Sequence, residues 1–175
     1  MNRSQVEHHL PGLRRYARVL TGDSWAADDL VQDTLERACR KWLLWRSGTD
    51  LRAWLFTVMH NVYLNQRRSA PPLQLLNLDD VEGSLAATPG QSPDTVIDLE
   101  RCLQRLPAEQ RAVLLLVTVE DMAYAEVARV LQVPVGTVMS RLSRARSRMR
   151  ECMDATASPR VHAPLATASA LRRMK

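Results

Sequence analysis

The sequence predicts an all-α protein with two small helical domains, a helical bundle and a helix-turn-helix domain, joined by a linker. Leu, Ala, Arg and Val dominate the 175 residues, aromatic residues make up only 5%, and only 6 residues are glycine. This composition favours helices over sheets. Apolar side chains recur at three- and four-residue steps, and alternation of β type never persists for more than a few residues.

The domain boundaries follow from a change in composition. Between residues 70 and 93 prolines break any long helix, and the charged side chains are all acidic. Beyond residue 154 the chain is rich in Ala, Ser, Thr and Pro and has no stable periodicity. We therefore expect a first domain at residues 1–69, a flexible linker at 70–93, a second domain at 94–154 and a disordered tail at 155–175.

Three helices are expected in the first domain, at about residues 6–20, 25–42 and 51–68. The first begins at or is interrupted by Pro11, and Gly22 ends it because glycine readily takes the left-handed conformation that follows a helix. Asp23 or Ser24 can then cap the second helix by accepting a hydrogen bond from a backbone N–H of its first turn.

Four helices are expected in the second domain, at about residues 95–106, 108–119, 122–131 and 135–150. Pro107 stops the first of them, and Asp121 is expected to cap the third. Pro134 ends the third helix because it pushes Val133 out of the helical region. It then starts the fourth, where its missing N–H costs little.

The last two of these helices have the layout of a helix-turn-helix DNA reader. Such a reader seats the apolar stripe of its second helix on the domain and points the N-terminal residues of that helix to base edges in the major groove. A guanidinium can bond guanine bidentately or clamp a phosphate. The alternative is that the second helix is simply a solvated, arginine-rich helix, but the turn marked by Pro134 favours a DNA-binding helix-turn-helix. The candidate contacts to duplex DNA are Gly136, Thr137, Met139, Ser140, Arg141, Arg144 and Arg148.

Two further polar surfaces are candidates for binding. Asp29, Asp33 and Glu36 recur at i, i+4 and i+7 with Gln32 beside them, and they form an acidic ridge that on composition alone is a solvated face. The third helix carries a polar stripe next to two arginines. Amide side chains can hydrogen-bond unpaired bases while arginines hold phosphates. The candidates for single-stranded DNA are Asn61, Asn65, Arg67 and Arg68, whereas Trp54 is expected to be a core aromatic.

The cysteines and histidines predict no cofactor and no metal site. Cys39, Cys102 and Cys152 are odd in number and far apart, so the sequence supports neither a disulfide framework nor a zinc site, and Cys39 and Cys102 are expected in the core. Because no apolar run reaches membrane-span length and no signal peptide is evident, we expect a cytoplasmic protein without membrane insertion. A net charge of +5 suits a polyanionic partner.

Three stretches resemble the extracytoplasmic-function (ECF) sigma factors of bacterial RNA polymerase, within the sigma-70 family. The segment 133–146 resembles the last conserved region, whose matching helix reads the minus-thirty-five promoter element as duplex. The segment 28–34 is similar to the part that docks on the β′ clamp helices of the polymerase. The run 51–68 resembles the segment that melts the minus-ten element and reads it as single strand. Two residues depart from the family pattern, Asp121 in place of Gly and Ala123 in place of Ser.

The resemblance implies roles for the candidate residues and a set of partners. Asn61 and Asn65 would border a pocket for an extruded base, and Arg67 and Arg68 would contact the backbone. The acidic ridge would bind core polymerase, with the β flap as a second contact. The expected partners are core RNA polymerase, promoter DNA both as duplex and as melted strand, and an anti-sigma factor that holds the protein inactive. The chain itself would catalyse no reaction.

Two other classes of function compete with this interpretation. A stand-alone helix-turn-helix regulator would bind duplex DNA without polymerase, but such proteins usually dimerise and no heptad stripe is evident. A helical nuclease would need further metal ligands beside Asp28, Asp29 and Asp33, and none occurs at suitable spacing.

Overall fold

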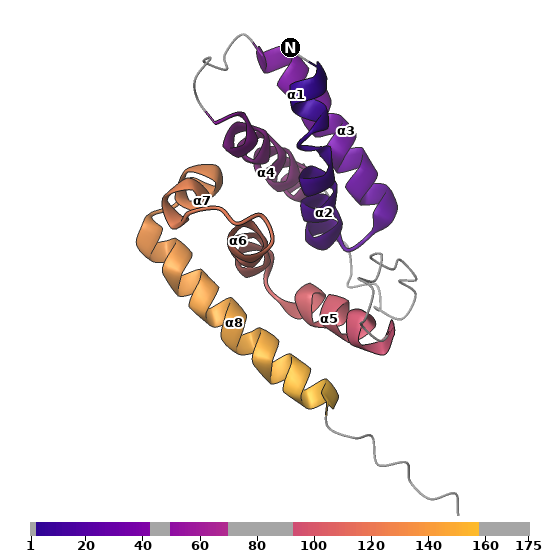
Figure 1. Cartoon of the computed structure of the whole chain (residues 1–175), viewed down its shortest axis with the longest axis vertical. Helices are drawn as coiled ribbons and strands as arrows, with labels where there is room; N and C mark the ends of the chain where they lie inside the picture. Colours follow the sequence, from indigo (N-terminus) through magenta and orange to yellow (C-terminus); the bar gives the residue numbers. More distant parts are fainter. Residues whose placement is uncertain (1–2, 43–49, 70–92, 158–175) are drawn as a thin grey trace, which may run out of the picture.

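The computed structural model describes residues 3–42, 50–69 and 93–157, and this part of the chain is all-helical without a strand, as predicted (Figure 1). The expected linker lies almost entirely outside the described residues, as does residue 158 onward of the expected tail. The helices are α1 (Arg3–Glu7), α2 (Leu10–Thr21), α3 (Ser24–Lys41), α4 (Leu51–Ser69), α5 (Pro93–Arg105), α6 (Ala108–Thr118), α7 (Tyr124–Leu131) and α8 (Val135–Ala157).

The N-terminal helical unit, α1 to α4, is organised around α3, which packs against α2 and α4, while Tyr16 of α2 meets Phe56 of α4 edge to face. Its core includes the fully buried Tyr16, Leu30 and Phe56. Gly22 ends α2 in the left-handed conformation at a φ of 76°, and the Asp23 carboxylate accepts a hydrogen bond from the backbone N–H of Ala26 at 2.7 Å. The predicted end of α2 and cap of α3 are therefore confirmed, and together they make the short turn between the two helices.

The C-terminal helical unit, α5 to α8, is built along α8, which contacts α5, α6 and α7. Val138, Leu142 and Ala145 face the core with at most 3% exposure, which confirms the middle of the predicted apolar stripe, whereas Val135 at its start is 38% exposed. The helix continues to Ala157, three residues past the expected end of the domain at 154, because Ala155 and Ala157 support helix formation.

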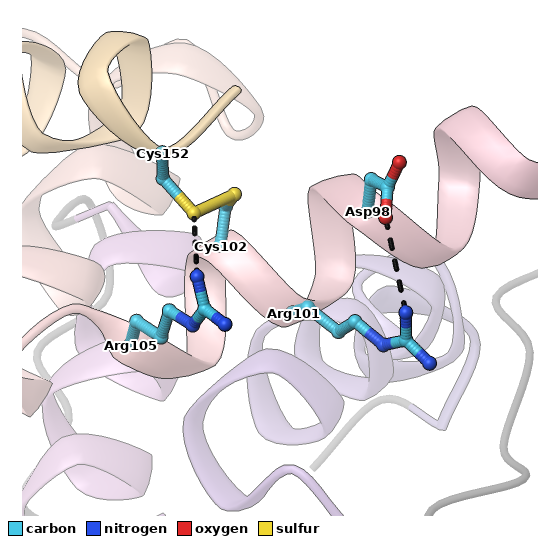
Figure 2. The surroundings of a disulfide bond; sticks show 5 residues. All are labelled: Asp98, Arg101, Cys102, Arg105 and Cys152. Atoms are coloured by element: carbon cyan, nitrogen blue, oxygen red, sulfur yellow. Dashed lines mark hydrogen bonds and ion pairs between the residues drawn. A yellow bond between two sulfur atoms is a disulfide. The ribbon is translucent and has the colours of Figure 1, made fainter. Parts of the chain in front are cut away.

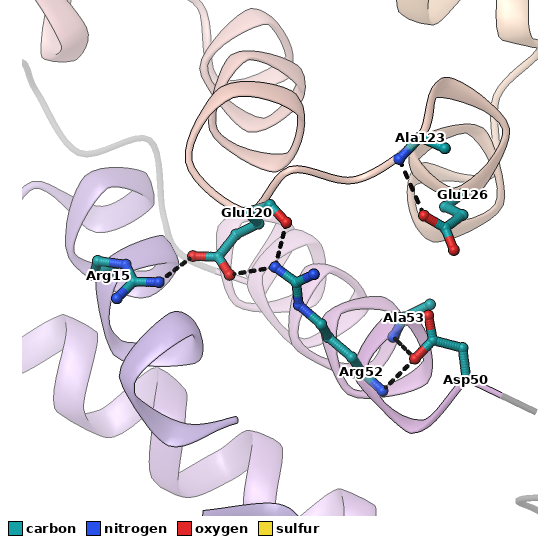
Figure 3. A network of polar contacts seen from close by, with 7 residues as sticks. All are labelled: Arg15, Asp50, Arg52, Ala53, Glu120, Ala123 and Glu126. Carbon is teal, nitrogen blue, oxygen red and sulfur yellow. Dashed lines mark hydrogen bonds and ion pairs between the residues drawn. The ribbon is translucent and has the colours of Figure 1, made fainter. Parts of the chain in front are cut away.

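The prediction that Asp121 caps the third helix of this unit is wrong. Asp121 has a φ of 50°, and α7 begins only after Ala123. An alanine side chain has no oxygen to offer as a cap, so the Glu126 carboxylate reaches back to accept a hydrogen bond from the Ala123 N–H at 3.0 Å (Figure 3). One half of a capping box therefore replaces the cap that the sequence lacks.

Two predictions about cysteines are also wrong. Cys102 on α5 and Cys152 on α8 form a disulfide, with their Cα atoms 5.7 Å apart, and Arg105 donates to the Cys152 sulfur at 3.6 Å (Figure 2). Cys102 is buried as expected, but Cys39 lies exposed on α3. The sequence separation of 50 residues gave no sign that the two cysteines are close, because their proximity arises only where the long α8 returns past α5.

The two helical units pack on each other. In the interface α2 contacts α5 and α6, while α4 contacts α7, so that α7 lies between α4 and α8 (Figure 1). The buried apolar residues of both units form one continuous core. The sequence did not predict this interface, since each unit already shows a separate amphipathic pattern.

Candidate nucleic-acid interface

The tight connection between α7 and α8 follows from the backbone at Gln132. This residue takes the left-handed conformation at a φ of 56°, and the N–H of Val133 bonds back to the carbonyl of Ala128 at 3.0 Å. The carbonyl of Pro134 then accepts from the Thr137 N–H at 2.9 Å and starts α8. The predicted helix, turn and second helix are present, and the start of α8 stands at the surface.

Four of the candidate contacts to duplex DNA lie exposed along α8. Gly136 has open space where a Cβ would stand, and Met139 is 51% exposed. Arg144 is exposed one turn further along the helix, whereas Arg148, also exposed, donates to the Gln110 side chain at 3.2 Å. Gly136, Met139 and Arg144 are therefore exposed on the first half of α8.

The other three candidates on α8 are partly buried. The Ser140 hydroxyl donates back to the carbonyl of Thr137 at 3.1 Å and so turns toward its own helix. Arg141 forms an ion pair with Glu109 of α6, and its side chain is only 22% exposed. The positive charge of Arg141 also contributes, after burial, to the lowered pKa of His60 on α4. In this arrangement the ion pair holds Arg141 against α6.

The candidates for single-stranded DNA share the second half of α4. Asn61 is half-buried, and Asn65, Arg67 and Arg68 are exposed. The Arg67 guanidinium stacks over the Tyr63 ring at 5.8 Å from its centre, which holds it along the helix. Tyr63 itself is 7% exposed and belongs to the core. The structure thus groups three exposed polar residues at one end of α4.

The acidic ridge on α3 is only partly a free surface. Asp29 and Gln32 are exposed, but Asp33 accepts a hydrogen bond from Gln66 of α4 at 3.0 Å. Glu36 forms an exposed ion pair with Arg40 at 3.5 Å. A shallow groove between α2 and α3 is lined by Arg14, Asp28, Val31, Gln32, Leu35, Glu36, Cys39 and Arg40. Gln32 and Glu36 of the ridge therefore line this groove together with apolar Val31 and Leu35, whereas Asp29 and Asp33 lie outside its lining.

Trp54 packs against the core, edge to face with Trp42 at 6.2 Å between ring centres, as predicted for a core aromatic. Burial, and then the charge of Arg141, lower the pKa of His60 to about 4, so the imidazole is neutral near pH 7. The neutral ring shares a hydrogen bond with the Tyr16 hydroxyl at 3.2 Å. The hydrogen bond between Tyr16 and His60 therefore links α2 to α4, the helix that carries the candidates for single-stranded DNA.

Sequence reasoning missed two charged residues that organise the interface, Glu120 and Arg111. Arg111 of α6 donates to the carbonyls of Val19 at 2.9 Å and Leu20 at 3.3 Å. These carbonyls lie in the last turn of α2, where a helix has no backbone donors of its own for them. Arg111 therefore caps α2 from the other helical unit, and no local sequence signal could have shown this.

Within the described ranges 3–42, 50–69 and 93–157, no group of three or more His, Cys, Asp or Glu side chains is placed to hold a metal ion. No helix in those ranges is long and apolar enough to cross a membrane.

Comparisons with known proteins agree with this geometry. The family model for the sigma2 domain of PhyR matches residues 6–60, and the model for sigma-70 region 4 matches residues 97–149. The ECF RNA polymerase sigma factor EcfG of Rhodopseudomonas palustris is 35% identical over 152 residues, which cover 84% of this chain and 82% of EcfG. The ECF sigma factor SigL of Mycobacterium tuberculosis is 38% identical over 148 residues, covering 80% of this chain and 81% of SigL.

Two solved structures share the fold. The sigma factor RpoE of Bartonella quintana, in complex with the anti-sigma factor NepR, matches with a TM-score of 0.72 and 30% identity, covering 86% of this chain and 95% of RpoE. CnrH in complex with the cytosolic domain of CnrY matches with a TM-score of 0.65 and 25% identity, covering 87% of this chain and 86% of CnrH. From the matched domains, their order and these relatives, it follows that the chain belongs to the ECF family of RNA polymerase sigma factors.

Proposed function

We propose that this sigma factor directs core RNA polymerase to its promoters by binding two DNA elements with two helices. In this proposal α8 reads the upstream element as duplex, and the second half of α4 holds the downstream element as melted single strand. The observation that carries the proposal is the exposed surface of Gly136, Met139 and Arg144, which follows a tight turn and is seated by an apolar stripe on the opposite side of α8.

We further propose that the groove between α2 and α3 binds core polymerase. Asp28, Gln32 and Glu36 line the groove with apolar Val31 and Leu35, and Asp29 is exposed on the same helix. This surface offers both charge complementarity and some apolar area to a basic helical partner. We propose the β′ clamp helices as the partner here and the β flap as a contact of the C-terminal helical unit. The chain would work in the cytoplasm, where polymerase and chromosome lie, and would catalyse no reaction itself.

RpoE was solved in complex with the anti-sigma factor NepR, and CnrH was solved in complex with the cytosolic domain of CnrY. By analogy we propose that an anti-sigma factor binds this chain as well. We propose residues 1–69 and 94–154 as the two functional domains, with residues 70–93 as their connection.

A run-off transcription assay with purified bacterial core polymerase tests the main proposal. Promoter-dependent transcripts that appear only when the folded chain is added support it. If the chain fails to bind core polymerase yet binds one duplex sequence tightly as a dimer, the stand-alone regulator is the better assignment. The matched control is the same reaction with a promoter whose upstream element is scrambled.

A further inference from the structure

The Cys102–Cys152 disulfide joins the first and last helices of the C-terminal helical unit, α5 and α8. The two cysteines differ in their access to solvent, since Cys102 is 1% exposed and Cys152 is half-buried. The rate of thiol–disulfide exchange depends on which sulfur an attacking thiolate can reach. A reagent from solution therefore meets the Cys152 sulfur first.

The Cys152 sulfur also lies beside a positive charge. The guanidinium of Arg105, exposed at the end of α5, donates to this sulfur at 3.6 Å (Figure 2). A neighbouring guanidinium favours the thiolate form of a cysteine, which is the form that attacks peroxides and disulfides. Arg101, one turn earlier on α5, is directed to Asp98 instead, with 3.9 Å between the charged atoms. Of these two arginines, only Arg105 can activate Cys152.

The proposed cytoplasmic location makes a permanent bond between these cysteines unexpected. Cytoplasmic thiols are kept reduced, and the disulfides that form there are usually transient, catalytic or redox-sensing. The Cα atoms of the two cysteines lie 5.7 Å apart, a separation at which a disulfide closes without movement of the backbone. In the reduced protein the buried Cys102 thiol is therefore placed to react with an oxidised Cys152.

We propose that Cys152 and Cys102 form a reversible oxidation site for hydroperoxides, in which Cys152 reacts first and Cys102 resolves. The Cys152 thiolate attacks one peroxide oxygen, so that an S–O bond forms and the O–O bond breaks. The other oxygen takes up a proton and leaves as water or an alcohol. Cys102 then loses its proton and attacks the Cys152 sulfur, and the S–S bond forms as the hydroxyl leaves with that proton as water. The two sulfurs are oxidised by two electrons in total, and the peroxide is reduced by two.

A dithiol reductant reverses the reaction through the accessible sulfur. Its thiolate attacks Cys152, the S–S bond breaks, and Cys102 leaves and takes up a proton. The second thiol of the reductant then displaces Cys152 from the mixed disulfide, and the reductant departs as its own disulfide. Cys152 is thus the entry point for both oxidation and reduction.

The state of this site affects the helix proposed to read the upstream element. The bond fixes the second half of α8 to α5, and the first half of α8 carries Gly136, Met139 and Arg144. Without the bond the C-terminal unit unfolds more readily, and the apparent affinity for DNA falls with the folded fraction. This consequence rests on the proposed function, whereas the chemistry at Cys152 does not.

The first test equilibrates the full wild-type chain in a glutathione buffer at a cytoplasmic ratio of reduced to oxidised glutathione. Thiol labelling and mass spectrometry should then find Cys102 and Cys152 mostly as thiols. After removal of the glutathione, a single equivalent of hydrogen peroxide should restore their bond while the exposed Cys39 remains a thiol. A bond that survives the glutathione buffer is a structural crosslink and overturns the proposal.

The second test uses Cys102→Ser, which removes the resolving thiol, so that oxidation should stop at a sulfenic acid on Cys152. Dimedone traps this acid, and trapping at Cys152 after addition of peroxide should be at least about fivefold faster than at Cys39. In this background Arg105→Gln should slow trapping roughly three- to tenfold. Arg101→Gln is the matched control, because it removes the same charge from α5 without touching the sulfur. Equal trapping at the two cysteines, or equal rates in the two arginine variants, refutes the assignment.

The third test separates this site from the proposed function. At the midpoint temperature of the reduced form in circular dichroism, half of the reduced protein is folded. Its affinity for a duplex carrying the upstream element should then be about twofold weaker than that of the oxidised form. Equal affinities at that temperature would refute control of the DNA reader by the bond. If the proposed function is wrong, neither form gives promoter-dependent transcripts with core polymerase, although Cys152 still reacts with peroxide.

Discussion

Reduction of the Cys102–Cys152 disulfide should destabilise the C-terminal helical unit by about 4 kcal/mol at 25 °C. The two cysteines are 50 residues apart, and the chain-entropy model assigns a loss of about that size when a loop of this length is no longer closed in the unfolded state. This change is a large part of the total stability of a small domain, which is typically about 5 to 15 kcal/mol. The disulfide therefore decides how much of the C-terminal unit stays folded in a reducing compartment.

The four tryptophans allow the effect to be located, because all of them lie between residues 25 and 54. Urea unfolding followed by tryptophan fluorescence reports on the N-terminal unit, whereas far-ultraviolet circular dichroism reports on both units. With reductant, the dichroism transition should move to lower urea more than the fluorescence transition. Cys152→Ser should behave like the reduced wild type, since it leaves the buried Cys102 in place as a small apolar side chain.

Cys39→Ser is the matched control, because it removes a thiol from the exposed surface of α3 and should leave the response to reductant unchanged. Thiol counting before and after reduction verifies that the bond was present and then broken. A change in unfolding free energy below about 1 kcal/mol after verified reduction would contradict the entropic argument.

Three further predictions concern the pH response and the two proposed surfaces. The pKa of His60 is lowered to about 4 from 6.5, so between these values the unfolded chain binds more protons than the folded one. Stability should thus fall as the pH falls from 6.5 toward 4, by up to about 3 kcal/mol, and His60→Gln should flatten this slope in urea titrations. Arg144→Ala should weaken binding of the upstream duplex by about 1 to 3 kcal/mol in fluorescence anisotropy. An equal loss on a scrambled duplex would assign Arg144 to a phosphate instead of a base. Asp29→Ala should slow association with core polymerase, most strongly at low salt, and leave binding of duplex DNA unchanged. A salt-independent rate in surface plasmon resonance would argue against that role for Asp29.

Local features of the structure could be predicted because local chemistry decides them. The left-handed end of α2 at Gly22, the cap of α3 at Asp23 and the break before Pro134 each depend on one residue and its immediate neighbours. The apolar stripe of α8 was equally readable, because periodicity along one helix reports the direction of its core.

The features that the sequence did not predict depend on contacts between distant segments. The disulfide requires the far end of α8 to pass α5, and the capping of α2 by Arg111 requires the two units to pack together. Asp121 failed as a cap because its backbone is in the left-handed region, where its side chain cannot serve the first turn of α7. For the candidate sites, the residue types could be read from the sequence. Only the structure showed that Arg144 is exposed whereas Arg141 is mostly buried in an ion pair.

The ion pair of Arg141 does not by itself prevent this residue from reading DNA. Its partner Glu109 is 66% exposed, and an ion pair of this kind contributes about 0 to 1 kcal/mol. A bidentate contact with guanine is worth about 1 to 3 kcal/mol, so DNA can compete with Glu109 for the guanidinium. Glu109 and Arg141 belong to the same helical unit, so their pair lasts until DNA displaces Glu109. Arg141 must leave this ion pair before it can reach a base, whereas Arg144 is already exposed. Of the two arginines, Arg144 should therefore contribute more to duplex binding. Arg144→Ala should weaken binding more than Arg141→Ala in fluorescence anisotropy, and a larger loss for Arg141→Ala would contradict this argument.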